Sequence, residues 1–123
     1  MDLELDHAIV RCTDKAAAAK FFADLIDAAP PRAAGPFAAV RVNDRLTLDF
    51  YDEGAFVFGH FAFLVGDRDF DAILNRVTTD GLPFGSRPFA RDRVINRING
   101  GRGFYVWDGD GNSYEFFTVR PPE

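Results

Sequence analysis

The sequence predicts an α+β fold in which one chain carries two tandem copies of a single module. Three observations predict this fold. The order of strand and helix patterns repeats, a histidine stands early in each half, and an acidic residue stands in the last strand of each half. The chain of 123 residues has room for one domain, with a first module at about residues 1–54 and a second at about residues 55–123.

The first module begins with a strand and a helix. Residues 5–12 are apolar and β-branched, as expected of a strand, and residues 13–14 (Thr-Asp) can cap a following helix. Over residues 15–28 the apolar side chains recur with helical spacing, and the two prolines at 30–31 are expected to end the helix. The apolar positions of this helix are Ala18, Phe21, Phe22, Leu25 and Ile26.

Two further strands complete the first module, and the second module repeats the order. Residues 37–42 and 45–51 are predicted strands around an Asn43-Asp44 turn. The pattern then restarts with a strand at 59–65 and a helix that Asp67 or Asp69 would cap and Gly81 would stop. The last predicted strands are residues 103–107 and 113–119, joined by the turn Asp108-Gly109-Asp110-Gly111.

The two halves can be aligned on their polar residues. The two histidines, His7 and His60, lie 53 residues apart and occupy the same place in the first strand of each module. The two acidic residues, Asp49 and Glu115, lie 66 residues apart, and each is followed by two aromatic residues. The second half therefore carries 13 extra residues between its helix and its hairpin, in the loop around residues 87–102.

These four polar residues are candidate metal ligands. A carboxylate in an apolar strand is costly to bury unless it is paired or binds a metal. Neutral imidazole and carboxylate groups suit Fe(II), Mn, Ni, Co or Zn. The alternative is that each histidine is a hydrogen-bonded structural residue, which is the more common role for an isolated strand histidine.

Composition narrows the class of partner. The net charge is -5, which disfavours nucleic acid and anionic membranes as partners. The single cysteine, Cys12, excludes an internal disulfide and a cysteine zinc site. The first residues lack the pattern of a signal peptide and no apolar stretch is long enough to span a membrane, so we expect a cytoplasmic protein.

Three segments make a family resemblance specific. These are residues 5–10 around His7, residues 59–63 around His60, and residues 103–112 leading to Glu115. On these segments the chain resembles the vicinal oxygen chelate superfamily, which includes glyoxalase I, type I extradiol dioxygenases and bleomycin resistance proteins. The resemblance covers nearly the whole chain and implies two βαβββ modules whose mixed sheets curl around a cavity, the glyoxalase/bleomycin resistance/dihydroxybiphenyl dioxygenase fold.

The resemblance also implies a ligand set. Metal-bearing members draw ligands from the first strand of each module and the last strand of the second, which correspond here to His7, His60 and Glu115. The glyoxalase-like branch adds a fourth ligand from the position of Asp49, which could instead serve with Glu115 as a catalytic base. The turn before Glu115 has Gly109 where the family usually has proline.

Three more residues are candidates for substrate binding. The extra loop is rich in arginine, and if it folds over the cavity, Arg97 and Arg102 could attract an anionic substrate. The same loop could simply be solvated. Tyr105 could donate a hydrogen bond near a metal-bound oxygen, whereas Tyr114 adjoins Glu115 in the strand and should face the opposite side.

Two functions from different classes follow. The first is a metal-dependent enzyme, dioxygenase-like or glyoxalase-like, in which a divalent metal acts as a Lewis acid on a small substrate with adjacent oxygens. The second is a metal-free protein that sequesters an aromatic antibiotic or another natural product; the many phenylalanines favour it and the ligand set counts against it. We also expect a homodimer, because small sheets often cover their edge strands in this way.

Overall fold

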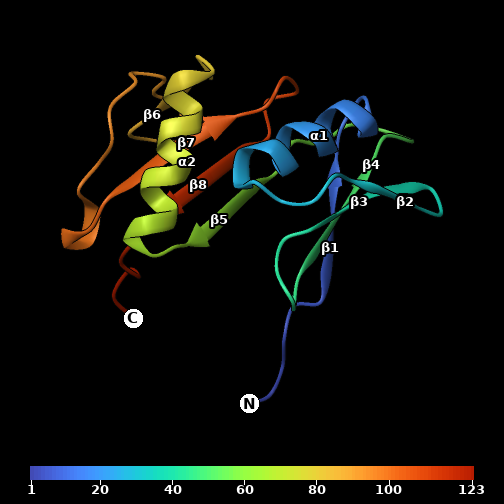
Figure 1. Cartoon of the computed structure of the whole chain (residues 1–123), viewed down its shortest axis with the longest axis horizontal. Coiled ribbons are helices and arrows are strands. Elements are labelled where there is room, and N and C mark those ends of the chain that lie inside the picture. The colour runs from blue at the N-terminus through green and yellow to red at the C-terminus, as the bar shows by residue number, and fades with distance from the viewer. The chain divides into compact units, whose positions relative to one another are not determined.

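The computed structural model describes residues 1–123, which form two compact units. The first unit contains residues 1–59 and 108–110, and the second contains residues 60–107 and 111–123. Each unit has one helix and one four-stranded mixed sheet (Figure 1). Neither helix has the length and apolar character that a membrane span requires.

The first unit is a βαβββ module with strand order β1-β4-β3-β2. Strand β1 pairs in parallel with β4, and the other neighbours are antiparallel. The short strand β2 was not predicted from the residue pattern. The elements are β1 (His7–Arg11), α1 (Lys15–Ile26), β2 (Arg32–Ala34), β3 (Phe37–Arg41) and β4 (Thr47–Tyr51).

The second unit repeats this topology with strand order β5-β8-β7-β6. Again the first strand is parallel to the last, and the remaining pairs are antiparallel. The α+β prediction of two tandem βαβββ modules is confirmed. The elements are β5 (His60–Leu64), α2 (Asp67–Thr79), β6 (Phe84–Gly85), β7 (Gly103–Trp107) and β8 (Ser113–Phe117), with a 3-10 turn at Ile98–Gly100.

Strand register shows that the paired polar residues are structurally equivalent. His7 lies opposite Thr47 in the first unit, and His60 lies opposite Ser113 in the second. Two positions further along the same strands, Asp49 lies opposite Ile9 and Glu115 lies opposite Ala62. Each histidine and its acidic residue therefore project from the same face of their sheet, because side chains two residues apart share a face.

The register also locates the extra residues of the second module. Arg32 lies opposite Ala39 in the first unit, and Gly85 lies opposite Tyr105 in the second, so the modules remain aligned through β6. The additional residues lie between β6 and β7, at residues 86–102, which we call the insert. They lie between α2 and the β7–β8 hairpin, as predicted, and they replace the tight β2–β3 turn of the first module.

The two helices begin differently. Asp14 caps α1 as predicted, since its Oδ1 accepts a hydrogen bond from the backbone N–H of Ala17 at 3.2 Å. The N-cap residue of α2 is Gly66, which has no side chain to accept a capping hydrogen bond. The expectation of a cap from Asp67 or Asp69 was therefore wrong. Both aspartates lie instead in the first turn of α2, where their charge complements the helix dipole.

The helix ends are set by left-handed residues. Helix α1 ends at Ile26, before the two prolines, because Asp27 adopts a left-handed conformation with φ of 56° and donates its N–H to the last carbonyls. Helix α2 ends as predicted near Gly81, which has φ of 66°. Glycine takes this conformation without the steric cost of a Cβ, and aspartate, the residue at position 27, is one of the few other residue types that tolerate it.

The phenylalanines fill the two cores unequally. In the first unit Phe22 of α1 packs against Phe50 of β4, with 6.1 Å between ring centroids. In the second unit Phe104 of β7 is surrounded by three other rings and is fully buried. Phe70 of α2, Phe84 and Phe116 contact it at centroid distances of 5.2, 6.1 and 5.7 Å. Much of the high phenylalanine content therefore serves core packing.

Candidate functional site

The second unit brings His60 and Glu115 into direct contact. Nε2 of His60 lies 3.0 Å from Oε1 of Glu115, and Nδ1 of the same ring lies 2.7 Å from the hydroxyl of Ser113. Both partners come from β8, which runs parallel to β5 with Ser113 opposite His60. The side chain of Glu115 is 19% exposed and that of His60 is 48% exposed, so the pair is open to solvent from the histidine side.

Tyr105 completes this cluster from β7. It lies opposite Glu115 in the antiparallel pairing, and its ring stacks on the His60 imidazole at a centroid distance of 5.6 Å. Burial raises the pKa of Tyr105 to about 12, and the charge and hydrogen bonding of Glu115 add to this effect. The phenol therefore stays protonated at neutral pH and keeps a proton with which it can donate a hydrogen bond.

A pocket of about 270 Å³ opens beside Glu115 and Tyr105. Its walls are mostly apolar, and no lysine, arginine or histidine side chain lines it. Glu115 is the one ionisable carboxylate in the lining. The other lining residues are Ala62, Asn96, Ile98, Asn99, Phe117, Val119 and Pro121.

The insert builds one wall of this pocket and is an ordered segment. The carboxylate of Asp92 accepts hydrogen bonds from the backbone N–H and the hydroxyl of Ser86, at 2.9 and 2.6 Å. Asn96 donates from its amide to the carbonyl of Ser86 at 3.0 Å and exchanges two backbone hydrogen bonds with Gly103. These contacts hold the 3-10 turn that carries Ile98 and Asn99 to the pocket.

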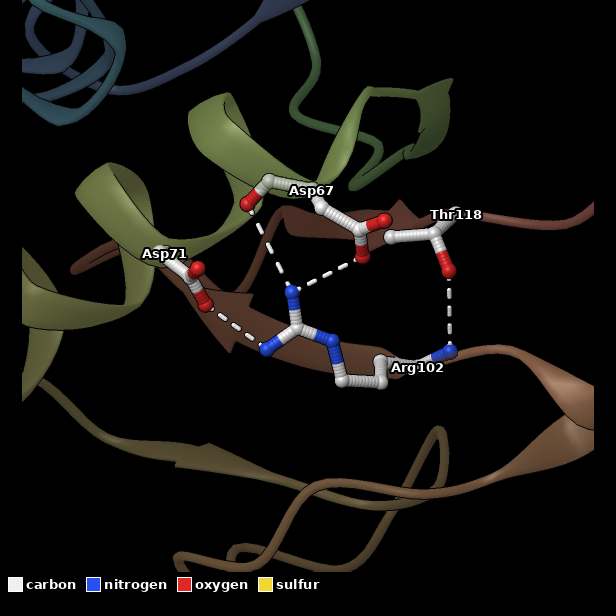
Figure 2. Close-up of polar contacts among 4 residues, drawn as sticks. All are labelled: Asp67, Asp71, Arg102 and Thr118. Carbon is white, nitrogen blue, oxygen red and sulfur yellow. Dashed lines mark hydrogen bonds and ion pairs between the residues drawn. The ribbon is translucent and has the colours of Figure 1, made fainter.

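Arg102 lies at the end of the insert and is turned towards helix α2 (Figure 2). Its guanidinium donates to the carboxylates of Asp71 at 2.7 Å and Asp67 at 2.9 Å, and its backbone N–H donates to the hydroxyl of Thr118 at 3.0 Å. The guanidinium carbon also lies 4.4 Å from the centre of the Phe70 ring. These contacts join the insert to the N-terminal part of α2 and direct the charge of Arg102 towards that helix.

The other predicted substrate-binding arginine is also outside the pocket lining. Arg97 is exposed, and its side chain has no hydrogen bond or ion pair. Of the three residues predicted to bind substrate, only Tyr105 lines the pocket.

In the first unit, His7 and Asp49 have a different environment from their counterparts. The side chain of His7 is 62% exposed, and its Nδ1 lies 3.0 Å from a carboxylate oxygen of the neighbouring Asp6. This hydrogen bond raises the pKa of His7, and the negative charges of Asp6 and Asp49 add to the effect. The hydroxyl of Thr47, which matches Ser113 in register, accepts a hydrogen bond from Arg41 at 3.0 Å.

The structure thus brings together His60, Glu115 and Tyr105, and it adds a residue that the sequence reasoning missed. Ser113 holds the imidazole of His60. A signal for it was present in the alignment of the two halves, where a hydroxyl residue recurs two positions before each acid, as Thr47 and Ser113. Within each unit, no group of three or more His, Cys, Asp or Glu side chains is arranged to hold a metal ion.

The chain is similar to two solved oxidase structures. Against "Oxidase ChaP-H1" it has 43% identity and a TM-score of 0.86, with 97% of this chain and 97% of that chain covered. Against "Oxidase ChaP-H2" it has 39% identity and a TM-score of 0.87, with coverage of 98% and 96%. A glyoxalase/bleomycin resistance protein from Catenulispora acidiphila shares the fold at 20% identity, with a TM-score of 0.71 and coverage of 96% and 100%.

The chain belongs to the same family as these two oxidases. It has the fold of the vicinal oxygen chelate superfamily. The predicted family resemblance is therefore confirmed. A scan against protein-family models and a search of curated proteins gave no match. The shared fold establishes the scaffold, while the reaction depends on the residues of the site.

Proposed function

We propose that this protein is a metal-dependent oxidase that acts on a small, mainly apolar substrate with adjacent oxygen atoms. The observation that carries the proposal is the contact of His60 with Glu115 beside a mainly apolar pocket that no cationic side chain lines. The identity of 43% with a protein named as an oxidase favours oxidation over the other chemistries of the superfamily. We propose His7, His60 and Glu115 as the metal ligands, with Asp49 as a fourth ligand or as a base.

The residues of the second unit fit a divalent metal by their chemistry. Imidazole nitrogen and carboxylate oxygen are a suitable donor pair for iron, manganese, nickel, cobalt or zinc. Two atoms 3.0 Å apart, as Nε2 of His60 and Oε1 of Glu115 are, can each lie about 2.1 Å from one ion. His7 is included in the proposal because the family resemblance implies a ligand from the first strand of each module. A bound metal of this kind supplies Lewis acidity and, if it is iron, reactivity towards dioxygen.

The other residues of the site bind and orient the substrate. Tyr105 keeps its proton at neutral pH and can donate a hydrogen bond to a substrate oxygen next to Glu115. Ile98, Phe117 and Val119 exclude water from the apolar part of the substrate. Because no cationic side chain lines the pocket, an anionic group there would be desolvated next to Glu115 without a partner. We therefore propose that the part of the substrate held here is uncharged.

Metal content tests the ligand assignment directly. We expect about one equivalent of a transition metal per chain, measured by mass spectrometry on protein purified without chelator or affinity-tag metal. The variants His60→Ala and Glu115→Ala should lose it, whereas Asp80→Ala, which removes an exposed carboxylate after α2, should retain it. Protein that contains no metal and takes up none from any of the five ions contradicts the ligand set and leaves metal-free binding of an aromatic compound as the function.

Oxygen consumption tests the chemistry and the charge preference together. The neutral catechol 2,3-dihydroxynaphthalene and its 6-sulfonate make a matched pair of probes that differ by one anionic group. We expect oxygen uptake by the iron-loaded protein with the neutral compound and at least a tenfold lower kcat/KM with the sulfonate. Equal turnover of the two probes would contradict the preference for an uncharged substrate, and metal binding without oxygen uptake from any catechol would contradict the oxidase assignment.

A further inference from the structure

Ser113 has a place in the site that the metal ligands alone do not explain. Its hydroxyl lies 2.7 Å from Nδ1 of His60, and this is the shorter of the two polar contacts that the ring makes. The position follows from the parallel register of β5 and β8, which sets Ser113 directly opposite His60. Ser113 itself is half-buried, so water competes less with its hydroxyl for this contact than at an exposed position.

We propose that Ser113 is the positioning residue for His60. The hydroxyl of Ser113 holds Nδ1, so that Nε2 points at the Glu115 oxygen that is the other ligand of the proposed metal. The inference rests on the proposed function, because it assigns Ser113 a role at the metal site. A metal-binding imidazole uses one nitrogen for the ion, and a partner on its other nitrogen fixes the orientation of the ring. The two contacts observed on opposite nitrogens of His60 have this arrangement.

A hydroxyl is well suited to this position because it can either donate or accept. While Nε2 donates its proton to Glu115, the hydroxyl of Ser113 can donate to Nδ1. When Nε2 is engaged by a metal, Nδ1 carries the proton and the same oxygen can accept it. Ser113 can thus keep the ring in one orientation in both states, without a second carboxylate next to Glu115.

The first module shows that this arrangement is particular to His60. At the equivalent position Thr47 also has a hydroxyl, but that hydroxyl accepts a hydrogen bond from Arg41. His7 is held instead by the carboxylate of its sequence neighbour, Asp6. The same repeated position therefore contacts its histidine in one module and serves a different contact in the other, which provides an internal control.

The experiment compares variants of equal shape in the full-length protein. Threonine and valine at position 113 differ only in the hydroxyl, so Ser113→Thr should keep the contact and Ser113→Val should lose it; Ser113→Ala is the simpler deletion. Thr47→Val removes the equivalent hydroxyl of the first module as the control. The readout is the dissociation constant for Co²⁺ alone, measured by competition with a chromophoric chelator, after circular dichroism has shown that each variant is folded.

We expect Ser113→Val and Ser113→Ala to bind Co²⁺ about tenfold more weakly than the wild type, the lower end of the range for residues that orient metal ligands. Ser113→Thr and Thr47→Val should stay within about twofold, a difference small beside that range. Wild-type affinity in Ser113→Val, or equal losses in Ser113→Val and Thr47→Val, would overturn the role of Ser113 while leaving the metal site in place. Absence of Co²⁺ binding by the wild-type protein would overturn the ligand assignment itself, and with it this inference.

Discussion

The two modules have the same topology and strand register, yet they differ around the acidic residue of the last strand. In the second module a histidine, a tyrosine and a pocket lie beside Glu115. In the first unit His7 is largely exposed and is held by Asp6, and its sheet turns from β2 to β3 through a two-residue loop. In the second unit the corresponding loop is the insert, which supplies Ile98 and Asn99 to the pocket beside Glu115. The comparison shows how a repeated scaffold can gain a binding pocket by lengthening one hairpin.

The hydrophobic cores of the two modules also differ, and the second module has more aromatic residues in its core. Phe104 of β7 lies opposite Phe116 of β8. The equivalent residue of the first unit is Ala38 of β3, which lies opposite Phe50 of β4. The aromatic cluster of Phe70, Phe84 and Phe104 therefore has no counterpart of equal size beside β3. The second module, which carries the pocket and the insert, is also the one with the larger aromatic core.

The largest effect is expected from removing the centre of this aromatic cluster. Phe104→Ala should lower the free energy of unfolding by about 4 kcal/mol, since it leaves a cavity among three rings in a fully buried position. Ala38→Gly, at the equivalent position of the first module, should cost about 1 kcal/mol or less. Chemical denaturation would measure both, and similar losses at the two positions would contradict the difference between the cores.

The next largest effect is expected where the insert packs on β6. A Cβ built on Gly85 would lie 1.6 Å from the backbone carbonyl oxygen of Ala90, so alanine there must displace the insert. We expect Gly85→Ala to cost about 3 kcal/mol in urea denaturation. Arg32→Ala, at the equivalent position of the first module, should change stability by less than about 0.5 kcal/mol because Arg32 is exposed. A neutral Gly85→Ala would contradict the close packing of the insert on β6.

The single thiol gives a pH-dependent prediction for the first unit. Burial raises the pKa of Cys12 to about 11, and the charges of Asp52 and Asp110 add to the effect, so the thiolate is disfavoured in the folded protein. At pH 8 we expect Ellman's reagent to react at least about 100-fold more slowly with the native protein than with the urea-unfolded protein. The native rate should continue to rise tenfold per pH unit beyond pH 9, whereas a plateau there would indicate an ordinary pKa.

The smallest effect concerns the unequal helix caps. Asp14→Ala should cost about 1 kcal/mol, because it removes the acceptor for the N–H of Ala17. Gly66 caps α2 without a side chain, and a Cβ there meets no atom within 4 Å. Gly66→Ser should therefore stabilise the protein by a few tenths of a kcal/mol. Thermal unfolding of both variants would measure the difference, and a destabilised Gly66→Ser would show that the glycine is needed for another reason.

Much of the fold could be predicted from local patterns. The 3.6-residue period of α1, the left-handed Gly81 and the repeated spacing of histidine and acid are properties of short segments, and the structure agrees with each. Strands β2 and β6 could not be found in this way, since they have three and two residues and form only through pairing with β3 and β7. The cap of α2 was assigned incorrectly because two aspartates near a helix start fit both a cap and a first turn.

The sequence by itself determined the two-module α+β fold and the choice of His60 and Glu115 as candidate ligands, because residue spacing and strand alternation are encoded locally. Only the tertiary structure decided the partners of these residues. Ser113 meets His60 across a sheet, Arg102 is drawn to Asp67 and Asp71 on α2, and the insert folds back on β6. The contacts of Ser113 and Arg102 join residues 53 and 31 positions apart in the chain. The contact between Ser113 and His60 depends on strand register, because a shift of one residue would turn the side chain to the other face of the sheet. The insert directly follows β6, and its return to β6 depends on hydrogen bonds such as the one from the N–H of Arg93 to the carbonyl of Phe84.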